Sequence, residues 1–124
     1  FNIIATDESA VIADLGVGGK DILIISNSAK GVTATVKEDY VAPAETSNNK
    51  FAVADVVLNA EDNVDIDMVA AGGTFGYAFQ GGAAASTLKG SNFADSIKGG
   101  ARADTLYGND GADTLEGGGG ADLL

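Results

Sequence analysis

The sequence predicts an all-β fold, and two observations favour it. From Gly72 to Leu124 the chain repeats every nine residues, with Gly at the first position and an apolar residue at the eighth position of each block. Before that region, short segments alternate apolar with polar residues, which is the period of a strand with one buried face. No stretch has the 3.6-residue period of an amphipathic helix.

The columns of the nonapeptide each have a physical interpretation. Glycine permits positive φ angles and close backbone approach. The apolar residue at the eighth position is typical of a very short strand that turns one side chain to a core. The sixth residue is Asp in the last four blocks, which places a carboxylate among backbone carbonyls, the ligands that a hard cation such as Ca²⁺ prefers. These aspartates are Asp95, Asp104, Asp113 and Asp122.

These blocks resemble the RTX nonapeptide, Gly-Gly-x-Gly-x-Asp-x-(apolar)-x, of bacterial calcium-binding secreted proteins. The match is specific over residues 90–124 and degenerate over residues 72–89. The resemblance implies a right-handed parallel β-roll in the C-terminal part. In that fold the first six residues of a block form a turn, the last three form a strand, and two blocks complete one coil.

The resemblance also implies a ligand set for Ca²⁺, which would lie between turns stacked on the same side. Asp95 is expected to pair with Asp113, and Asp104 with Asp122. The sixth position of the two preceding blocks holds Tyr77 and Ser86 instead, so an empty or poor site is expected there. Loop carbonyls are expected to complete each shell, and they belong to Gly99, Gly108, Asn109, Asp110, Gly111 and Gly117.

Some blocks depart from the pattern. The fourth position holds Phe93 and Arg102 where the pattern has Gly, and the second holds Ser91 and Asn109. Asparagine tolerates left-handed backbone better than most residues, so Asn109 is the milder change. A flexible Gly-rich linker is the alternative interpretation. A linker, however, has no reason to keep an apolar residue in register at position eight.

The part before the repeats is predicted to be rich in strands and to form a solenoid or a sandwich-like segment. Residues 42–50, with the only proline, are predicted to form the main exposed loop and a boundary. Three segments follow: a strand-rich segment 1–50, a transition segment 51–80 with degenerate repeats, and the β-roll 81–124, interrupted at its C-terminus. The predicted strands are 1–6, 22–26, 32–37 and 51–58.

Two later stretches also alternate. From Val64 to Met68 apolar residues alternate with aspartates, so we expect the acids to face solvent. From Phe75 to Phe79 three aromatic residues alternate in the same way and are predicted to fill the interior. The acidic cluster 61–67 lacks the Gly and the terminal Glu of an EF-hand loop. Solvated acids, a second calcium site and a cation-bridged contact with a neighbouring molecule all fit it.

The Gly-rich stretch Gly16–Ile24 resembles a phosphate-binding loop only superficially. Asp14 and Asp21 stand where that motif needs Gly and Ser or Thr, so nucleotide binding is not expected. In the nonapeptide frame the same stretch has Gly16, Gly19 and Asp21 at positions one, four and six. Both a plain β-turn and an isolated RTX-type turn fit it.

Composition excludes several function classes. The chain has neither His nor Cys, so it cannot build a Ser-His-Asp triad or a thiolate zinc site. Its net charge of −11 favours repulsion from nucleic acid and from anionic membranes. No segment is long and apolar enough to insert into a membrane. We therefore expect no catalytic residues, no nucleic acid partner and no membrane insertion.

Fourteen of the 18 glycines lie in residues 72–124, where ordering the backbone is costly. We therefore expect the last four blocks to be ordered by Ca²⁺, which stabilises the folded state that binds it. By resemblance, such proteins are exported unfolded by type I secretion and fold outside the cell.

The function predicted is a non-catalytic extracellular or cell-surface calcium-binding module with a structural role. A self-assembling filament or surface-layer subunit fits this role, because an open strand end could accept residues 1–6 of a neighbour in a head-to-tail homo-oligomer. Two alternatives are the calcium-folded C-terminal module of a larger secreted enzyme or toxin, and an adhesin module.

Overall fold

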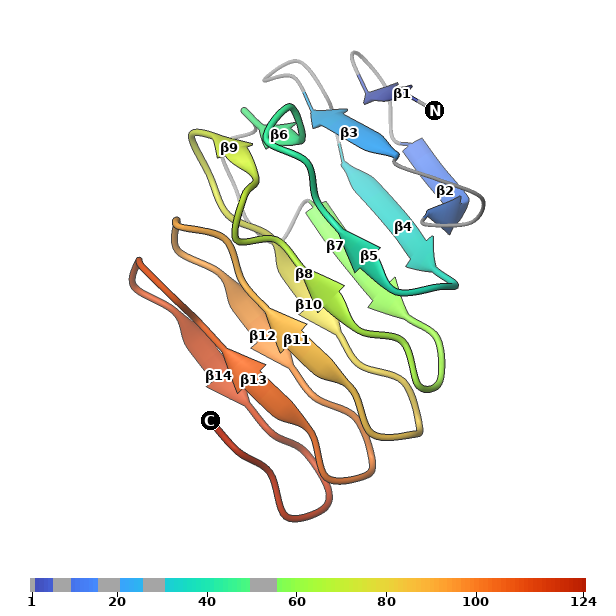
Figure 1. Cartoon of the computed structure of the whole chain (residues 1–124), viewed down its shortest axis with the longest axis vertical. Helices are drawn as coiled ribbons and strands as arrows, with labels where there is room; N and C mark the ends of the chain where they lie inside the picture. Colours follow the sequence, from blue (N-terminus) through green and yellow to red (C-terminus); the bar gives the residue numbers. More distant parts are fainter. Residues whose placement is uncertain (1, 6–9, 16–20, 26–30, 50–55) are drawn as a thin grey trace.

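The strands of this protein stack as the coils of a parallel β-solenoid (Figure 1). The computed structural model describes residues 2–5, 10–15, 21–25, 31–49 and 56–124. Within these ranges all regular structure is strand, which confirms the all-β prediction, and no helix there is long and apolar enough to cross a membrane. The N-terminal alternative of a sandwich is excluded, because the paired strands there run parallel within continuous sheets.

Three parallel sheets form the walls of the solenoid. The six-stranded sheet contains β2 (Ala10–Leu15), β4 (Val32–Val36), β7 (Val56–Ala60), β10 (Ala78–Gln80), β12 (Ser96–Lys98) and β14 (Thr114–Glu116). The C-terminal four-stranded sheet contains β5 (Tyr40–Val41), β8 (Ile66–Asp67), β11 (Thr87–Lys89) and β13 (Thr105–Tyr107). The N-terminal four-stranded sheet contains β1 (Asn2–Ala5), β3 (Ile22–Ile25), β6 (Ser47–Asn48) and β9 (Gly72–Gly73).

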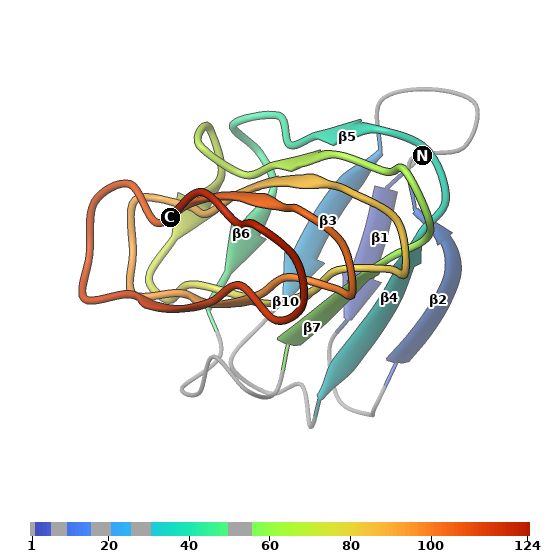
Figure 2. The same ribbon diagram turned by 90° about the horizontal axis from the view of Figure 1, so that it is seen from below.

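The coils shorten from the middle of the chain toward its C-terminal end. In the six-stranded sheet Val32 pairs with Val56, 24 residues later, and Val57 pairs with Ala78, 21 residues later. From Ala78 onward each residue pairs with the residue 18 positions later. The N-terminal four-stranded sheet ends at β9, so the 18-residue coils have two strands each. Figure 2 shows these last coils as flat loops that overlie one another.

The nonapeptide frame matches the strands of this region. The last three positions of a block form β10, β11, β12, β13 and β14, and the six preceding residues form the connection, except that the block of β10 begins with β9. Alternate blocks pair with one another, because β10, β12 and β14 lie in one sheet and β11 and β13 in another. The prediction of one coil per two blocks is therefore confirmed, and the flexible-linker alternative is wrong.

An apolar core fills the wide coils and thins toward the C-terminus. The eighth residues of four successive blocks are buried, but Leu115 is only partly buried and Leu124 is 64% exposed. The expectation that every eighth residue faces a core is thus wrong for Leu124, since no further strand covers it among the described residues. The buried core consists of Leu23, Ile25, Val32, Ala34, Val36, Tyr40, Ala42, Val56, Leu58, Ala60, Val64, Ile66, Met68, Ala71, Tyr77, Phe79, Leu88, Ile97 and Leu106.

The stretch 42–50 does not form the exposed loop that its composition predicts. Thr46 and Asn48 are fully buried, and β6 lies inside this stretch. The Tyr40 hydroxyl donates to the carbonyl of Asp21 at 2.9 Å and forms a second hydrogen bond with the Thr46 hydroxyl at 3.1 Å. Asn48 donates through Nδ2 to the carbonyl of Gly76. Because these polar groups find partners inside, the segment can line the core.

The two alternating stretches behave largely as predicted. Between Val64 and Met68 the apolar side chains are buried, while Asp65 is exposed and Asp67 is half-buried. Of the three aromatic residues, Tyr77 and Phe79 are buried and pack edge to face, with ring centroids 6.4 Å apart. Phe75 is only partly buried, so it does not fill the interior as expected.

Some predictions fall on residues outside the described ranges. Residues 16–20 of the Gly-rich turn and residues 51–55 of a predicted strand are among them. The six-stranded sheet continues from β2 to β14 through all three predicted segments. The boundaries at 50 and 80 stay predictions.

Replacing Ile66 with alanine is expected to destabilise the fold by about 2–5 kcal/mol, because the buried side chain leaves a cavity between coils. Urea unfolding, followed by far-UV circular dichroism, measures the change. Val41→Ala is the control, since Val41 lies on the neighbouring strand β5 but is 69% exposed. Equal midpoints for the two variants would contradict the core assigned here.

Candidate metal centre

The four predicted aspartates stand at equivalent places, each directly before the strand of its block, except that the last precedes an isolated bridge at Leu123. The structure stacks them in two pairs, and the two members of each pair are 18 residues apart in the sequence. The backbone N–H of Asp95 donates to Oδ1 of Asp113 at 2.9 Å, and that of Asp104 donates to Oδ1 of Asp122 at 2.9 Å. The expected pairs are therefore brought together across successive coils.

Two of these carboxylates are buried without a cationic partner. Asp95 is 3% exposed and Asp104 is 2% exposed. The ion pairs among the described residues join Lys89 to Asp67 and Lys98 to Glu116, away from both. Burial raises the pKa of Asp95 to about 6, and the charge of Asp113 adds to this, against the opposing effect of N–H donors from Tyr77 and Ser91. A cation at this place would remove the cost of the buried charge.

Oxygen atoms from two coils converge beside the first glycines of two turns, Gly90 and Gly99. A Cβ atom on Gly90 would lie 2.5 Å from Oδ2 of Asp95 and 2.7 Å from the carbonyl oxygen of Gly108. At Gly99 it would lie 2.7 Å from Oδ2 of Asp104 and in contact with the carbonyl oxygen of Gly117. Glycine is thus required at both places. The same space is bordered by a carboxylate and a carbonyl, which are the ligands of a hard cation.

The residues at position two, which depart from the sequence pattern, support these turns. The Ser91 hydroxyl donates to both carboxylate oxygens of Asp95, at 3.1 and 3.0 Å, and its N–H donates to Oδ2 at 2.6 Å. Asn109 donates through Nδ2 to the carbonyl of Gly90 at 2.8 Å and has a φ of 68°. The tolerance expected of Asn109 is confirmed, while the function of Ser91 in orienting Asp95 was not foreseen.

The remaining predicted ligands lie in the same turns. The carbonyls of Gly108 and Gly117 border the two convergent sites, whereas the parts played by those of Gly99, Asn109, Asp110 and Gly111 stay predictions. Among the described residues there is no group of three or more His, Cys, Asp or Glu side chains able to hold a metal. A cation held here must therefore take much of its shell from backbone carbonyls.

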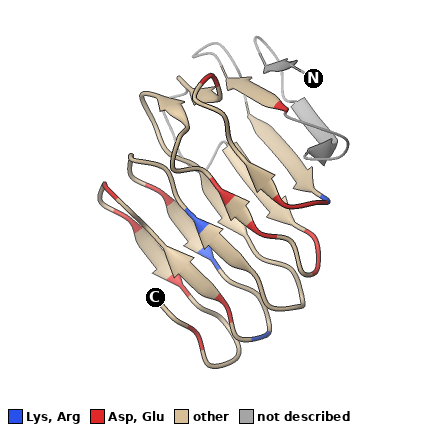
Figure 3. Cartoon of the chain, in the orientation of Figure 1, with Lys and Arg blue, Asp and Glu red and all other residues tan. Residues whose placement is uncertain are grey.

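Two aspartates of the acidic cluster 61–67 act as acceptors for backbone N–H groups, and cation binding by this cluster stays a prediction. Oδ1 of Asp62 accepts the N–H of Ala83 at 2.6 Å and that of Ala84 at 3.3 Å, and Oδ1 of Asp65 accepts the N–H of Thr87 at 2.6 Å. These carboxylates accept hydrogen bonds from the following coil. The direction is opposite to that in the last coils, where the aspartate of the later coil accepts from the earlier one. Figure 3 shows that acidic residues gather in the loops that join the strands.

The comparison with protein families settles the nature of the repeats. The model of the RTX calcium-binding nonapeptide repeat matches residues 89–124, with four copies. Residues 89–124 are an array of RTX repeats. RTX nonapeptide repeats bind Ca²⁺, and the range agrees with the residues 90–124 in which the sequence pattern is specific. No curated protein and no solved structure matches the sequence significantly.

The chemistry of the RTX array fits the geometry of this chain. Carboxylates, carbonyls and a hydroxyl are oxygen donors of the kind that Ca²⁺ takes. Asp95, Asp104, Asp113 and Asp122 remain the residues that we assign to Ca²⁺ through their side chains, a prediction that the stacking and burial support.

Gly99→Ala is expected to destabilise the calcium-bound RTX array by about 1–3 kcal/mol, because its methyl group would overlap the backbone carbonyl of Gly117. Urea unfolding in saturating Ca²⁺ measures this. The matched control is Gly119→Ala, whose Cβ atom would meet its nearest neighbour, the carbonyl oxygen of Ala101, at 3.1 Å. A control that destabilises as much as Gly99→Ala would argue against a special requirement at the first position.

Proposed function

We propose that this chain is a non-catalytic extracellular module whose C-terminal coils fold on binding Ca²⁺ and whose role is structural. One observation carries the proposal. Two carboxylates, those of Asp95 and Asp104, are buried in narrow coils, and each is stacked against the next aspartate without a described basic side chain beside it. Such an arrangement is costly unless a cation compensates the charge.

The residues of the turns prepare this place for an ion. Asp95 is held by three donated hydrogen bonds from Ser91 and one from the N–H of Tyr77. Asp104 is held by the N–H groups of Ser86 and Gly100. When bound, Ca²⁺ supplies the positive charge that the stacked carboxylates lack. The glycines at the first position keep side chains out of the space that the oxygens share.

The wide coils and the 18-residue coils differ in the interactions that stabilise them. The wide coils before Ala78 contain most of the buried apolar residues, whereas each 18-residue coil buries little more than its eighth residues. Burial of apolar area is the main source of stability where it is available. We infer that the wide coils form a metal-independent support, that residues 51–80 form the transition, and that residues 81–124 form the β-roll, whose last four blocks, residues 90–124, depend on Ca²⁺.

An extracellular or cell-surface location follows from the same chemistry. Extracellular calcium modules bind their ion at about 10⁻⁴–10⁻³ M, which a low-calcium cytosol does not provide. A chain that stays unfolded inside the cell and orders outside suits export by type I secretion. RTX repeats are typical of secreted bacterial proteins, which supports this proposal, as does the net charge of −11.

A structural role by assembly is supported by the edges of the solenoid. β14 and β13 are the last strands of their sheets, and the side chains of Leu123 and Leu124 are 61% and 64% exposed. Strand edges and apolar side chains at one end can accept a further coil. We propose that a second copy supplies it, in a head-to-tail arrangement of the filament or surface-layer type.

Removing Ca²⁺ is expected to abolish the β-structure of residues 90–124 and to leave the wide coils folded. Far-UV circular dichroism with Ca²⁺ and with a chelator should show a partial loss of β-signal, and limited proteolysis should place the new cleavage sites after residue 89. An unchanged spectrum and an unchanged digestion pattern would remove calcium-dependent folding from the proposal.

The same titration tests the assigned ligands. Asp104→Asn is expected to raise the midpoint of the calcium titration by about tenfold or more, because ligand charge sets the affinity of Ca²⁺ sites. Asp110→Asn is the control: it removes the same charge from an exposed side chain that is assigned only through its carbonyl. Equal shifts in both variants would show a general effect of charge instead of coordination.

Assembly is expected to require the ordered array. Sedimentation velocity in millimolar Ca²⁺ should show species larger than the monomer, and a chelator should return them to monomers. A chain that stays monomeric at high concentration in Ca²⁺ would contradict the head-to-tail proposal while leaving calcium binding untouched.

A further inference from the structure

We propose that the turns 81–86 and 99–104 hold a third and weaker Ca²⁺ site, in which the hydroxyl of Ser86 stands in for the missing carboxylate. The proposal rests on the proposed function, because it extends the same series of stacked turns by one. It goes against the simple expectation that a block without Asp at position six ends the series.

The turn that contains Ser86 stands against the next coil as the later turns do. The N–H of Ser86 donates to Oδ1 of Asp104 at 2.8 Å. This repeats the contacts of Asp95 with Asp113 and of Asp104 with Asp122, both at 2.9 Å. In all three pairs of stacked turns, therefore, the N–H of position six donates to the carboxylate one coil later.

The glycines at position two repeat as well. A Cβ atom on Gly100 would touch the carbonyl oxygen of Gly82, and one on Gly118 would touch the carbonyl oxygen of Gly100. The turns 81–86 and 99–104 therefore approach one another at position two as the turns 99–104 and 117–122 do. They differ at position one, where a Cβ atom on Gly81 would lie nearest to the backbone N of Gly100 instead of a carbonyl oxygen, and at position six, where the earlier turn has Ser86.

That side chain is a polar group left without a partner. Ser86 is 5% exposed, and its Oγ atom has no hydrogen-bond partner. A buried hydroxyl in this state destabilises the fold, because its bond to water has not been replaced. Oγ is a neutral oxygen ligand on the same turn whose N–H already contacts Asp104, a buried carboxylate. An ion between the two turns would satisfy both groups at once.

The turn 72–77, which precedes turn 81–86, shows why the series of sites does not extend further toward the N-terminus. The N–H of Tyr77 donates to Oδ1 of Asp95 at 2.6 Å, so the same backbone contact with the following coil is present. The Tyr77 ring, however, is fully buried and packs edge to face on Phe79 as part of the apolar core. Because the Tyr77 ring packs in the core, its hydroxyl does not replace a carboxylate at the turn. The side chain of Ser86 is short, so its hydroxyl stays close to the backbone of its own turn.

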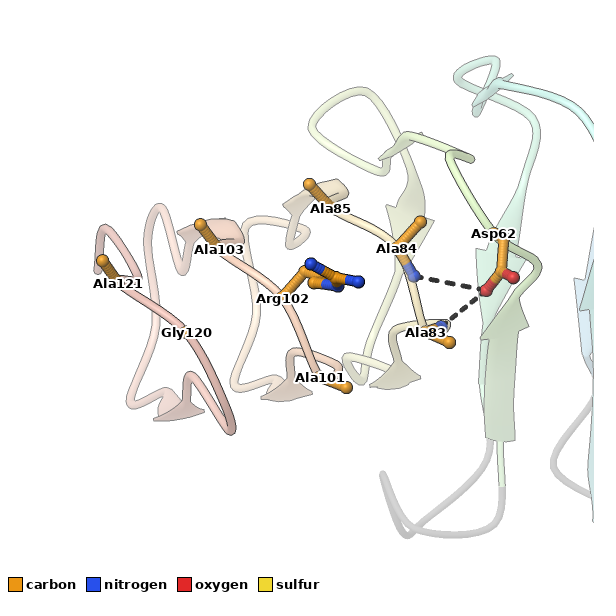
Figure 4. A pocket seen from close by; sticks show the side chains of 9 residues that line it. All are labelled: Asp62, Ala83, Ala84, Ala85, Ala101, Arg102, Ala103, Gly120 and Ala121. Carbon is orange, nitrogen blue, oxygen red and sulfur yellow. Dashed lines mark hydrogen bonds between the residues drawn. The ribbon is translucent and has the colours of Figure 1, made fainter.

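One feature makes the site between turns 81–86 and 99–104 weaker than the others. It has one carboxylate instead of two, and the affinity of Ca²⁺ sites follows the charge of the ligands. Arg102, at position four of turn 99–104, lines a groove of about 900 Å³ on this side of the coils, together with Ala83, Ala84 and Asp62 (Figure 4). Because turn 99–104 also forms the site shared with Asp122, the positive charge of Arg102 opposes a cation at both places.

The consequence is a junction between the two kinds of coil. Turn 81–86 is held on its N-terminal side by Asp62, which accepts the N–H groups of Ala83 and Ala84. On its C-terminal side it contacts Asp104, which also contributes to the site shared with Asp122. The third ion therefore ties the calcium-held coils to the coils that an apolar core supports.

Calcium stoichiometry tests the proposal. Equilibrium dialysis with radioactive Ca²⁺ on the full chain should show two tighter ions and one ion that binds about tenfold or more weakly. Ser86→Ala should remove the weak ion alone, and Ser86→Asp should convert it to a tight one. Ser96→Ala is the matched control, because Ser96 is exposed on β12. Arg102→Gly should tighten the weak ion and the ion shared by Asp104 and Asp122 without changing the total.

The outcomes separate this proposal from the proposed function. Absence of calcium binding by the wild-type chain would overturn both. Two tight ions in the wild type, with no further ion in Ser86→Asp, would overturn the third site only. Circular dichroism in saturating Ca²⁺ verifies folding of each variant, and if Ser86→Ala does not fold, the gain of a tight ion in Ser86→Asp still decides the question.

Discussion

The stacking of one aspartate on the backbone of the coil before it is the interaction on which the C-terminal half depends. Each contact joins residues 18 positions apart, and the carboxylates of Asp95 and Asp104, which accept the N–H groups of the coil before, are largely removed from water. A negative charge in such a place is stable only if something positive lies nearby. Lys89 and Lys98 pair with other acids, so we propose that a metal ion meets this requirement.

The width of the coil explains why the molecule uses two means of stabilisation. A coil with strands in three sheets encloses apolar side chains from several directions, as around Leu58, Ile66 and Met68. A coil of two nonapeptides has two strands of three residues and room for one apolar residue from each. The carboxylate contacts change with the width. Asp62 and Asp65 accept hydrogen bonds from the coil that follows, whereas Asp95 and Asp104 accept them from the coil before.

Several features lay beyond sequence reasoning because they depend on which polar groups the fold brings together. The polar stretch around Thr46 and Asn48 looks like a surface loop, yet Tyr40 and Gly76 provide the hydrogen bonds that allow its burial. Ser91 appears as a defect of the repeat, yet its hydroxyl orients Asp95. No local pattern distinguishes a satisfied polar side chain from an exposed one, since the difference lies in which groups the fold brings near.

The sequence by itself determined the strands of the first five of the six nonapeptide blocks, the pairing of alternate blocks and the identity of the stacked aspartates. It could do so because a strict nine-residue period repeats one local geometry, so each residue's neighbour in space is known from its number. Only the tertiary structure decided how the first coils close, which acids serve as backbone acceptors and which turns contact Asp104. There the period is absent, and contacts between coils of 20 to 26 residues follow from packing instead of counting.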